Sequence, residues 1–380
     1  MSVRRSCFAI ALAIGLTISV SQSANAVSDV TYHWGGYQGV GGNLKVPTAI
    51  GTLSDVTAIA AGNISGMALA GGKVYTFGSG YAGEFGNGST GGFRKMAKVV
   101  PGLPAIVAIG ESMDTDVAVT AGGNVYGWGR NQGGQLCTGN TTEYKRPVEL
   151  TRLSNVASAE GGNHHMIYLT DSGAVESCGT NTQGELGGGA VGKNHGPISV
   201  PLPVTALAVT SGSDISAALL ANGQVWDWGS NRFGQLGDGS KKQKSSVPVE
   251  VPLPSAAVEV SSGGSSPPNG QTLALLANGQ VWGWGCDTNG QLGNGSRHTT
   301  NAMPVQSTAL PSDVTFTDVV SGGAFALALD SSGNVWAWGD DKGGQVGNGY
   351  RHGTVRDPVK VLSGATMISA TASDALAQVG

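Results

Sequence analysis

Two adjacent histidines and several aspartates are the residues of this chain whose types and spacing could do chemistry. A histidine beside a carboxylate can serve as a general acid or base, and the same side chains can also form a polar binding surface. The alternative is structural: such residues cap strand ends and hydrogen-bond neighbouring Gly-rich loops. The candidate binding residues are Asp114, Asp116, His164, His165, Asp214 and Asp374.

Other signatures of chemistry are missing from the sequence. It contains no G-x-S-x-G, no Gly-rich loop ending in Gly-Lys-Ser/Thr, no Cys-x-x-Cys and no His-Glu-x-x-His. The segment Asp287-Thr-Asn289-Gly290 has a passing likeness to a calcium loop, but its Gly stands at the fourth position and no Glu closes it. We therefore assign no catalytic residue and predict no metal site and no cofactor.

The elements that must position these residues come from a repeat. A pair formed by an aromatic residue or Cys and a following Gly recurs at intervals of 43 to 56 residues, often followed by a Gly-Gln-Leu-Gly loop. Seven such pairs cover the chain beyond its first 26 residues, so this part is one repeat domain, residues 27–380. The pairs begin at Trp34, Phe77, Trp128, Cys178, Trp228, Trp284 and Trp338.

Each unit contains four short runs of β-forming residues separated by Gly, Asn and Ser turns, which is typical of an antiparallel meander. A four-stranded meander cannot bury both faces alone, and seven at this period predict blades packed around an axis. We expect an all-β fold, a seven-bladed β-propeller. The last unit stops before its aromatic strand and the chain opens with one, Val30–Gly35, so one blade is expected to be shared by the N- and C-terminal segments.

The aromatic strand carries all eight Trp residues. Alternate residues of a strand share a face, so Trp226 and Trp228 should present two rings to a neighbouring blade, as should the pairs at 282/284 and 336/338. Cys178 replaces the ring in the fourth unit, where we expect looser packing.

In an up-and-down meander the loop after the first strand and the Gly loop after the third emerge on the same face. The first strands are rich in small residues, which suits the crowded strand nearest the axis. The first loops, which carry the candidate residues, should therefore surround the central opening. Basic residues follow each Gly loop and would form a rim, namely Lys45, Arg94, Lys95, Lys98, Lys145, Arg146, Lys193, Lys241, Lys242, Lys244, Arg297 and Arg351.

The repeated Trp-Gly, Asn, Gly-Gln-Leu-Gly and Gly pattern resembles the repeat family named after the regulator of chromosome condensation, over about residues 30 to 380. The resemblance implies a seven-bladed propeller. The family includes a guanine-nucleotide exchange factor, proteins with other partners and a secreted bacterial inhibitor of β-lactamases. In the exchange factor an Asp and a His of equivalent loops help bind the GTPase, and the matching position here is His165. The other units place Ser65, Thr115, Ile215, Gln271, Phe325 and Asp374 there.

The first 26 residues read as a secretory signal peptide: two Arg, a 14-residue apolar run and Ala24-Asn-Ala26. We expect a secreted or periplasmic product without a membrane span in its mature part. Three cysteines would remain, Cys137, Cys178 and Cys286, an odd number that implies no disulfide framework. With 21 basic and 25 acidic residues the chain offers no general charge footprint for nucleic acid.

These features favour an exported, non-enzymatic protein-binding propeller, an inhibitor or receptor-like scaffold that uses the loops around the opening as its interface. We expect a monomer with a protein partner. One alternative is an enzyme acting on a polysaccharide or small molecule at the central opening. A second, by family likeness, is a guanine-nucleotide exchange factor.

Overall fold

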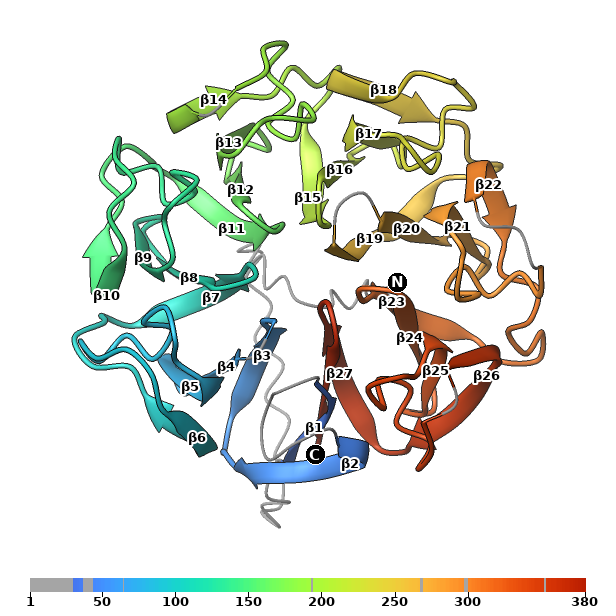
Figure 1. Ribbon diagram of the computed structural model, residues 1–380, viewed down its shortest axis with the longest axis horizontal. Helices are drawn as coiled ribbons and strands as arrows, with labels where there is room; N and C mark the ends of the chain where they lie inside the picture. The colour runs from blue at the N-terminus through green and yellow to red at the C-terminus, as the bar shows by residue number, and fades with distance from the viewer. Residues whose placement is uncertain are drawn as a thin grey trace, which may run out of the picture.

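The fold is a ring of seven four-stranded antiparallel sheets, which confirms the predicted all-β propeller (Figure 1). The computed structural model describes residues 30–36, 44–63, 65–192, 194–266, 269–296, 300–351 and 353–380. The predicted signal peptide lies outside these residues. The described part of the chain contains no helix with the length and apolarity of a membrane span.

The innermost strand of each blade lies nearest the axis (Figure 1). These strands are short and rich in Ala, Val, Ser and Gly, because small side chains let seven strands converge. The innermost strands are β3 Val56–Ala61, β7 Ile106–Glu111, β11 Val156–Gly161, β15 Ala206–Ser211, β19 Ala257–Ser266, β23 Phe316–Ser321 and β27 Ala365–Ala370.

The second and third strands form the buried middle of each blade. The second strands are β4 Ser65–Ala70, β8 Thr115–Thr120, β12 His165–Thr170, β16 Ile215–Leu220, β20 Asn269–Leu276, β24 Phe325–Asp330 and β28 Asp374–Val379. The third strands, which carry the aromatic residues, are β5 Lys73–Ser79, β9 Val125–Gly129, β13 Val175–Gly179, β17 Val225–Ser230, β21 Val281–Cys286, β25 Val335–Asp340 and β1 Val30–Gly35.

The outermost strands form the circumference. They are β6 Phe93–Val99, β10 Tyr144–Glu149, β14 Asn194–Ser199, β18 Lys244–Val251, β22 Thr300–Gln306, β26 Thr354–Leu362 and β2 Leu44–Thr52. We name the blades in ring order: A contains β27, β28, β1 and β2, B contains β3–β6, and C to G follow along the chain to β26.

Blade A closes the ring with both ends of the chain, as predicted. Its order is β2-β1-β28-β27, and β1 pairs with β28 without interruption from Val30↔Val379 to Gly35↔Asp374. The ring therefore closes by six consecutive residue pairs between its two termini.

In blades A, C, E and G, the last Trp of the third strand links the blade to the blade before it, whereas blade B has Phe77 at this position. The indole N–H of Trp338 donates to the backbone carbonyl of Gln291 at 2.8 Å, and that of Trp34 to Gln345 at 2.8 Å. Trp128 and Trp228 make the same bond to residues 84 and 185, at 2.9 and 2.7 Å. Each acceptor is the Gln or Glu of the preceding blade's Gly loop, and each ring is fully buried.

The Trp two residues earlier lies on the same side of the strand and is half-buried. Trp226 packs in one cluster with Trp228, Leu169 of blade D and Val209 of blade E. The same arrangement recurs in blades F and G, where Trp282 and Trp336 contact the equivalent clusters. These contacts confirm that the paired rings form the core between neighbouring blades.

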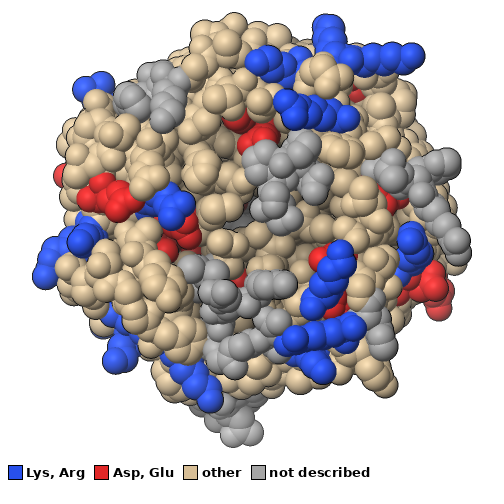
Figure 2. All heavy atoms as spheres, in the orientation of Figure 1, with Lys and Arg blue, Asp and Glu red and all other residues tan. Residues whose placement is uncertain are grey.

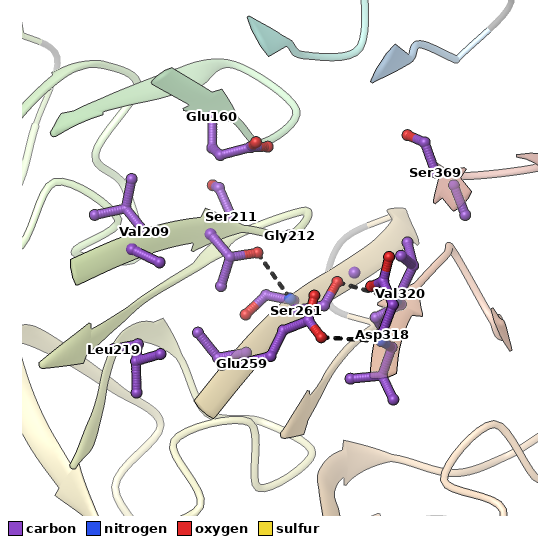
Figure 3. Close-up of a pocket in the computed structure, with 18 of the residues that line it drawn as sticks. Glu160, Val209, Ser211, Gly212, Leu219, Glu259, Ser261, Asp318, Val320 and Ser369 are labelled. Atoms are coloured by element: carbon purple, nitrogen blue, oxygen red, sulfur yellow. Dashed lines mark hydrogen bonds between the residues drawn. The ribbon is translucent and has the colours of Figure 1, made fainter. Parts of the chain in front are cut away.

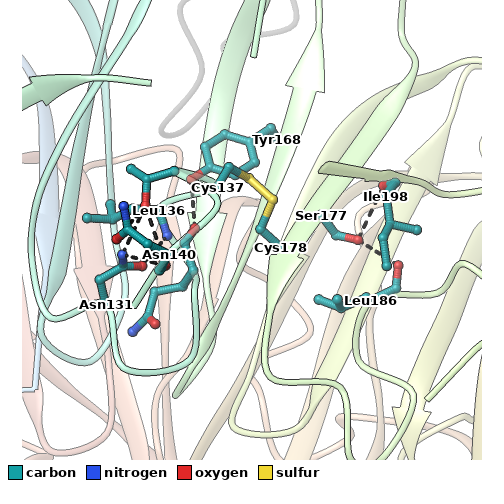
Figure 4. Close-up of a disulfide and its surroundings, with 11 residues drawn as sticks. Asn131, Leu136, Cys137, Asn140, Tyr168, Ser177, Cys178, Leu186 and Ile198 are labelled. Carbon is teal, nitrogen blue, oxygen red and sulfur yellow. Dashed lines mark hydrogen bonds between the residues drawn. A yellow bond between two sulfur atoms is a disulfide. The ribbon is translucent and has the colours of Figure 1, made fainter. Parts of the chain in front are cut away.

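Blade D, where Cys178 replaces the Trp, uses different chemistry at the same place. Cys178 forms a disulfide with Cys137, which lies in the Gly loop of blade C (Figure 4). The phenol of Tyr168 in β12 donates to the carbonyl of Gln135 at 3.1 Å, so it takes the bond that an indole makes in other blades. All three side chains are fully buried. The predicted looser packing is therefore wrong, and two of the three cysteines form a disulfide although their odd number implied no disulfide framework.

The two cysteines replace two residues that are in contact in other blades, the Trp of the third strand and a Gly of the preceding blade's loop. Cys137 has a φ of 56°, and the same loop position elsewhere is a positive-φ Gly, as in Gly187, Gly237 and Gly347. A Cβ on those glycines would approach the next blade's Trp ring to 2.7–2.8 Å. A side chain fits at residue 137 because Cys178 leaves the space of an indole empty. Cys286, the third cysteine, is buried and free.

We expect Trp338→Phe to lower the free energy of unfolding by about 2–4 kcal/mol, because it removes a buried hydrogen bond and leaves a small cavity. The control is Trp226→Phe, because the Trp226 indole is half-buried and makes only a long hydrogen bond, of 3.5 Å, to Gln224. This variant should lower the free energy of unfolding by less than about 1 kcal/mol. The measurement is urea unfolding. Equal losses for the two variants would mean that the link between blades does not depend on the buried indole.

Reduction of the Cys137–Cys178 disulfide should lower the free energy of unfolding by about 2–4 kcal/mol. The measurement is thermal unfolding with and without reductant, and the Cys137→Ser, Cys178→Ser double variant should be insensitive to reductant. Alkylation of the denatured, unreduced chain should label Cys286 but neither residue of the pair. Labelling of all three would show that the disulfide does not form.

Candidate functional site

The first loops and the Gly loops lie side by side on one face of the ring, which we call the loop face. A backbone hydrogen bond joins them in successive blades. The N–H of Arg130 donates to the carbonyl of Asp114 at 2.8 Å, and that of Ser230 donates to Asp214 at 2.9 Å. His164 accepts the equivalent bond from residue 180 at 2.9 Å. The blades therefore hold these candidate residues by their backbones.

Asp114 forms an ion pair on this face. Its carboxylate lies 3.1 Å from the guanidinium of Arg130, whose side chain is 32% exposed. Burial raises the pKa of Asp114, and the positive charge of Arg130 opposes that rise. The pair therefore presents the Arg130 guanidinium to solvent above a largely covered carboxylate.

Asp214 and His164 are the candidates that solvent reaches. Asp214 is half-buried, and burial raises its pKa to about 6, opposed by the charge of Arg232. His164 is exposed. Together with the Asp114–Arg130 pair, they place acidic and basic side chains on the loops of blades C, D and E.

The remaining three candidates lie inside the ring. His165 is 1% exposed, and its Nε2 lies 2.7 Å from the Ser211 hydroxyl and 3.0 Å from that of Ser216. Burial lowers the pKa of His165 to about 3, which makes this ring neutral. Asp374 lies 2.8 Å from Nε2 of His33 and is 2% exposed. Asp116 is 1% exposed.

The position that holds His165 is buried in every blade. The equivalent residues contact the same or the next blade: Ser65 donates to Glu111 at 2.7 Å, and the amide of Gln271 donates to the Ser321 hydroxyl at 2.9 Å. These contacts match the strand-end role considered above. The residues at this position are Ser65, Thr115, His165, Ile215, Gln271, Phe325 and Asp374, each under 9% exposed.

A group of buried carboxyls between blades B and C escaped sequence reasoning. Glu84 accepts the Ala82 N–H at 2.8 Å, and burial raises its pKa to about 7. Burial, with repulsion from its acidic neighbours, raises the pKa of Glu111 and of Asp116 well above the usual range. A signal was available, because Gly-Glu-Phe-Gly at 83–86 departs from the Gly-Gln-Leu-Gly pattern.

A second missed feature is a cavity of about 890 Å³ between the innermost strands. Its walls come from all seven blades and carry the carboxyls of Glu160, Glu259 and Asp318 (Figure 3). These residues stand in strands rather than in the loops, and no motif marks them.

The predicted basic rim is visible in part. On the face drawn in Figure 2, most Lys and Arg lie towards the circumference, whereas Asp and Glu occur both beside the central hollow and at the edge. Some rim residues bind their own neighbours: the Lys244 ammonium donates to the Thr182 carbonyl at 2.9 Å. Lys193 and Arg297 lie outside the described residues.

Comparison with known proteins finds the same repeat. A model of the regulator of chromosome condensation (RCC1) repeat matches residues 122–169, 222–266 and 278–329, and a second matches 207–235, 258–291 and 316–345. Over 118 residues the sequence is 35% identical to Protein RCC2 homolog of Xenopus laevis. This matched segment makes up 31% of this chain and 23% of that protein. The matched segments span less than a quarter of the curated relatives' lengths.

Two solved structures share the whole architecture. Human WBSCR16 superposes with a TM-score of 0.81 at 19% identity, covering 93% of this chain and 99% of that one. Prp20p of Saccharomyces cerevisiae, in a study of its binding to Gsp1p and histones, superposes with a TM-score of 0.80 at 19% identity, covering 92% and 91%. At these identities the likeness shows the fold.

Glu84→Gln should stabilise the protein increasingly as pH rises. Gln at the same loop position, as in Gln291, accepts the equivalent backbone N–H at 2.9 Å, so the bond is kept. The pKa of Glu84 in the folded protein, about 7, exceeds its ordinary value of 4.5. The unfolded chain therefore ionises first as the pH rises, so the wild type loses stability between pH 4.5 and about pH 7 and no more above that. We expect a gain of about 1–3 kcal/mol at pH 8 and almost none at pH 4.5, by denaturant unfolding.

The reverse substitution is the matched test. Gln291→Glu should acquire the pH dependence that Glu84→Gln loses, since its side chain is fully buried. A flat difference in stability from pH 4.5 to 8 for both variants would contradict the assignment.

Proposed function

Because the chain belongs to the RCC1 repeat family, we propose that it is an exported propeller that binds a protein partner through its loop face. The observation that carries the proposal is the set of backbone bonds that hold the loops of blades C to E. They fix the exposed His164 and the half-buried Arg130 and Asp214 on a rigid scaffold. Loops held in this way often carry binding function.

A protein partner is supported by the relative of the same fold, for which binding to Gsp1p and histones is described. The Asp114–Arg130 ion pair of the loop face is held at 3.1 Å, and Arg232 lies close enough to Asp214 for its charge to act on that carboxyl; both favour a preorganised surface. Complementary charges of this kind direct the choice of partner.

Binding, rather than catalysis, is favoured by the placement of the histidines. His165 is buried and neutral against two serine hydroxyls, where it cannot exchange protons with a substrate. His164 is exposed, and the neighbouring Asp114 carboxylate is engaged by Arg130. The two halves of an acid–base pair thus lie in different settings.

Export is supported by two features. The first 26 residues read as a signal peptide, and the Cys137–Cys178 disulfide is of a kind that persists in oxidising compartments. The disulfide joins blades C and D, whose loops carry Arg130 and His164. An oxidising medium would therefore keep this part of the interface rigid.

The proposal is tested by affinity capture from the native extracellular and envelope fraction. The test variant carries His164→Ala, Asp214→Ala and Arg232→Ala, which removes one charge of each sign from the loop face. We expect wild-type protein to retain a specific partner and the variant to bind it at least about tenfold more weakly, since few central residues carry most binding energy.

The matched control carries Lys73→Ala, Asp171→Ala and Asn222→Ala, three exposed residues near the turns that connect second and third strands on the opposite face. This control also loses one charge of each sign and should bind like wild type. A partner that binds both variants equally would contradict the loop face as the interface, and no partner for wild type would contradict protein binding.

A further inference from the structure

The innermost strand of each blade forms part of the wall of the central cavity. Hydrogen bonds keep neighbouring innermost strands in register, because the hydroxyl of the fifth residue of one strand accepts the backbone N–H of the sixth residue of the next strand around the ring. Ser262 N–H donates to the Thr210 hydroxyl at 2.9 Å, and Ser321 N–H donates to that of Ser261 at 3.0 Å. Equivalent positions along these strands therefore lie at similar depths.

Four carboxyls lie on these strands at three different depths. Glu111 is the sixth residue of β7, Glu160 the fifth of β11, and Glu259 and Asp318 the third residues of β19 and β23. Since a strand rises about 3.3 Å per residue, the carboxyls are spread over about 10 Å along the axis. Figure 3 shows that Glu160 reaches from β11 towards the cavity, which Glu259 and Asp318 line from other strands.

No basic side chain on the walls faces these carboxyls. No Lys, Arg or His occurs among the described residues that line the cavity, whose other members are mostly Ala, Val, Leu, Gly and Ser. Burial raises the pKa of Glu160 to about 8, and burial with repulsion from Asp318 raises that of Glu259 well above the usual range. One oxygen of Glu111, a 6% exposed residue, accepts from Ser65, and the other has no hydrogen-bond partner among the described residues.

We propose that the central channel binds a linear aliphatic polyamine. Ammonium groups separated by three or four methylenes match carboxyls that are spaced along the axis, and the methylenes match the apolar walls between them. A metal ion fits less well, because it needs several oxygens around one point, and the described residues contain no group of three or more metal-binding side chains that could hold one. One end of the cavity reaches the first loops, where Asn63, Ser112 and Asn163 line it, but Glu160, Glu259 and Asp318 stand on the innermost strands and not in those loops.

Isothermal titration of the purified protein with spermidine tests the proposal, with Mg²⁺ at matched ionic strength as the control for charge alone. We expect saturable binding of spermidine and at least about tenfold weaker binding of Mg²⁺. Absence of spermidine binding at millimolar concentration, or equal binding of both cations, would overturn the proposal.

The variant pair locates the site. Glu160→Gln with Glu259→Gln should weaken spermidine binding at least about tenfold, since hydrogen bonds to charged groups are strong. Glu149→Gln with Glu250→Gln removes the same charge from exposed positions and should not change it. Equal affinity in the two double variants would overturn the site, whereas capture of a protein partner should be unaffected by either.

A pH readout remains informative if a variant folds poorly. With its pKa about 8, Glu160 is largely protonated at neutral pH, so a bound ammonium must displace a proton and affinity should rise from pH 6 to 8.5. The titratable groups on the strands packed against β11 are Glu111 on β7, Asp116 on β8 and His165 and Tyr168 on β12, whereas β15 has none. His165 stays neutral over this range. Affinity that does not rise with pH would contradict a role for Glu160.

Discussion

The hydrogen bond from a buried Trp indole to the loop carbonyl of the preceding blade is the interaction on which the rest of this ring depends. It ties the third strand of one blade to the Gly loop of another, as in Trp338 and Gln291. The large ring fills the space between two sheets, and its one polar atom is satisfied by a backbone group that is itself buried. The loop must then come close to the ring, which explains a positive-φ Gly such as Gly293 beside the indole.

Blades F and D show that the link between blades is kept even where the usual Trp–carbonyl bond is absent. Blade F keeps its Trp284 but bonds it to the Asp227 carboxyl at 2.7 Å. Blade D lacks the Trp, and there a disulfide restores the link between blades while the Tyr168 phenol satisfies the loop carbonyl. A covalent bond and a longer phenol thus replace the packing and the hydrogen bond of one indole.

Because the same contacts hold the Gly loops, they also position the loop face. Backbone bonds to the first loops fix the Gly loops, so the exposed His164 and the half-buried Asp214 stand on a rigid base. Several acidic residues, such as Glu84 and Glu160, lie between the blades or along the axis instead, where burial raises their pKa values. The fold therefore separates a charged outer surface from a channel with carboxyls and no basic lining residue among those described.

By itself, the sequence determined the repeat, the four-stranded unit, the shared closing blade and the burial of the Trp pairs, because these follow from period-two patterning and turn residues within about fifty neighbouring positions. Only the tertiary structure decided which loop residues reach solvent. His164 and His165 are adjacent, yet one is exposed and the other is bonded to serines of the next blade. It also decided the Cys137–Cys178 pairing and the depths of Glu160 and Glu259, since these depend on contacts between blades whose residues are far apart in the chain.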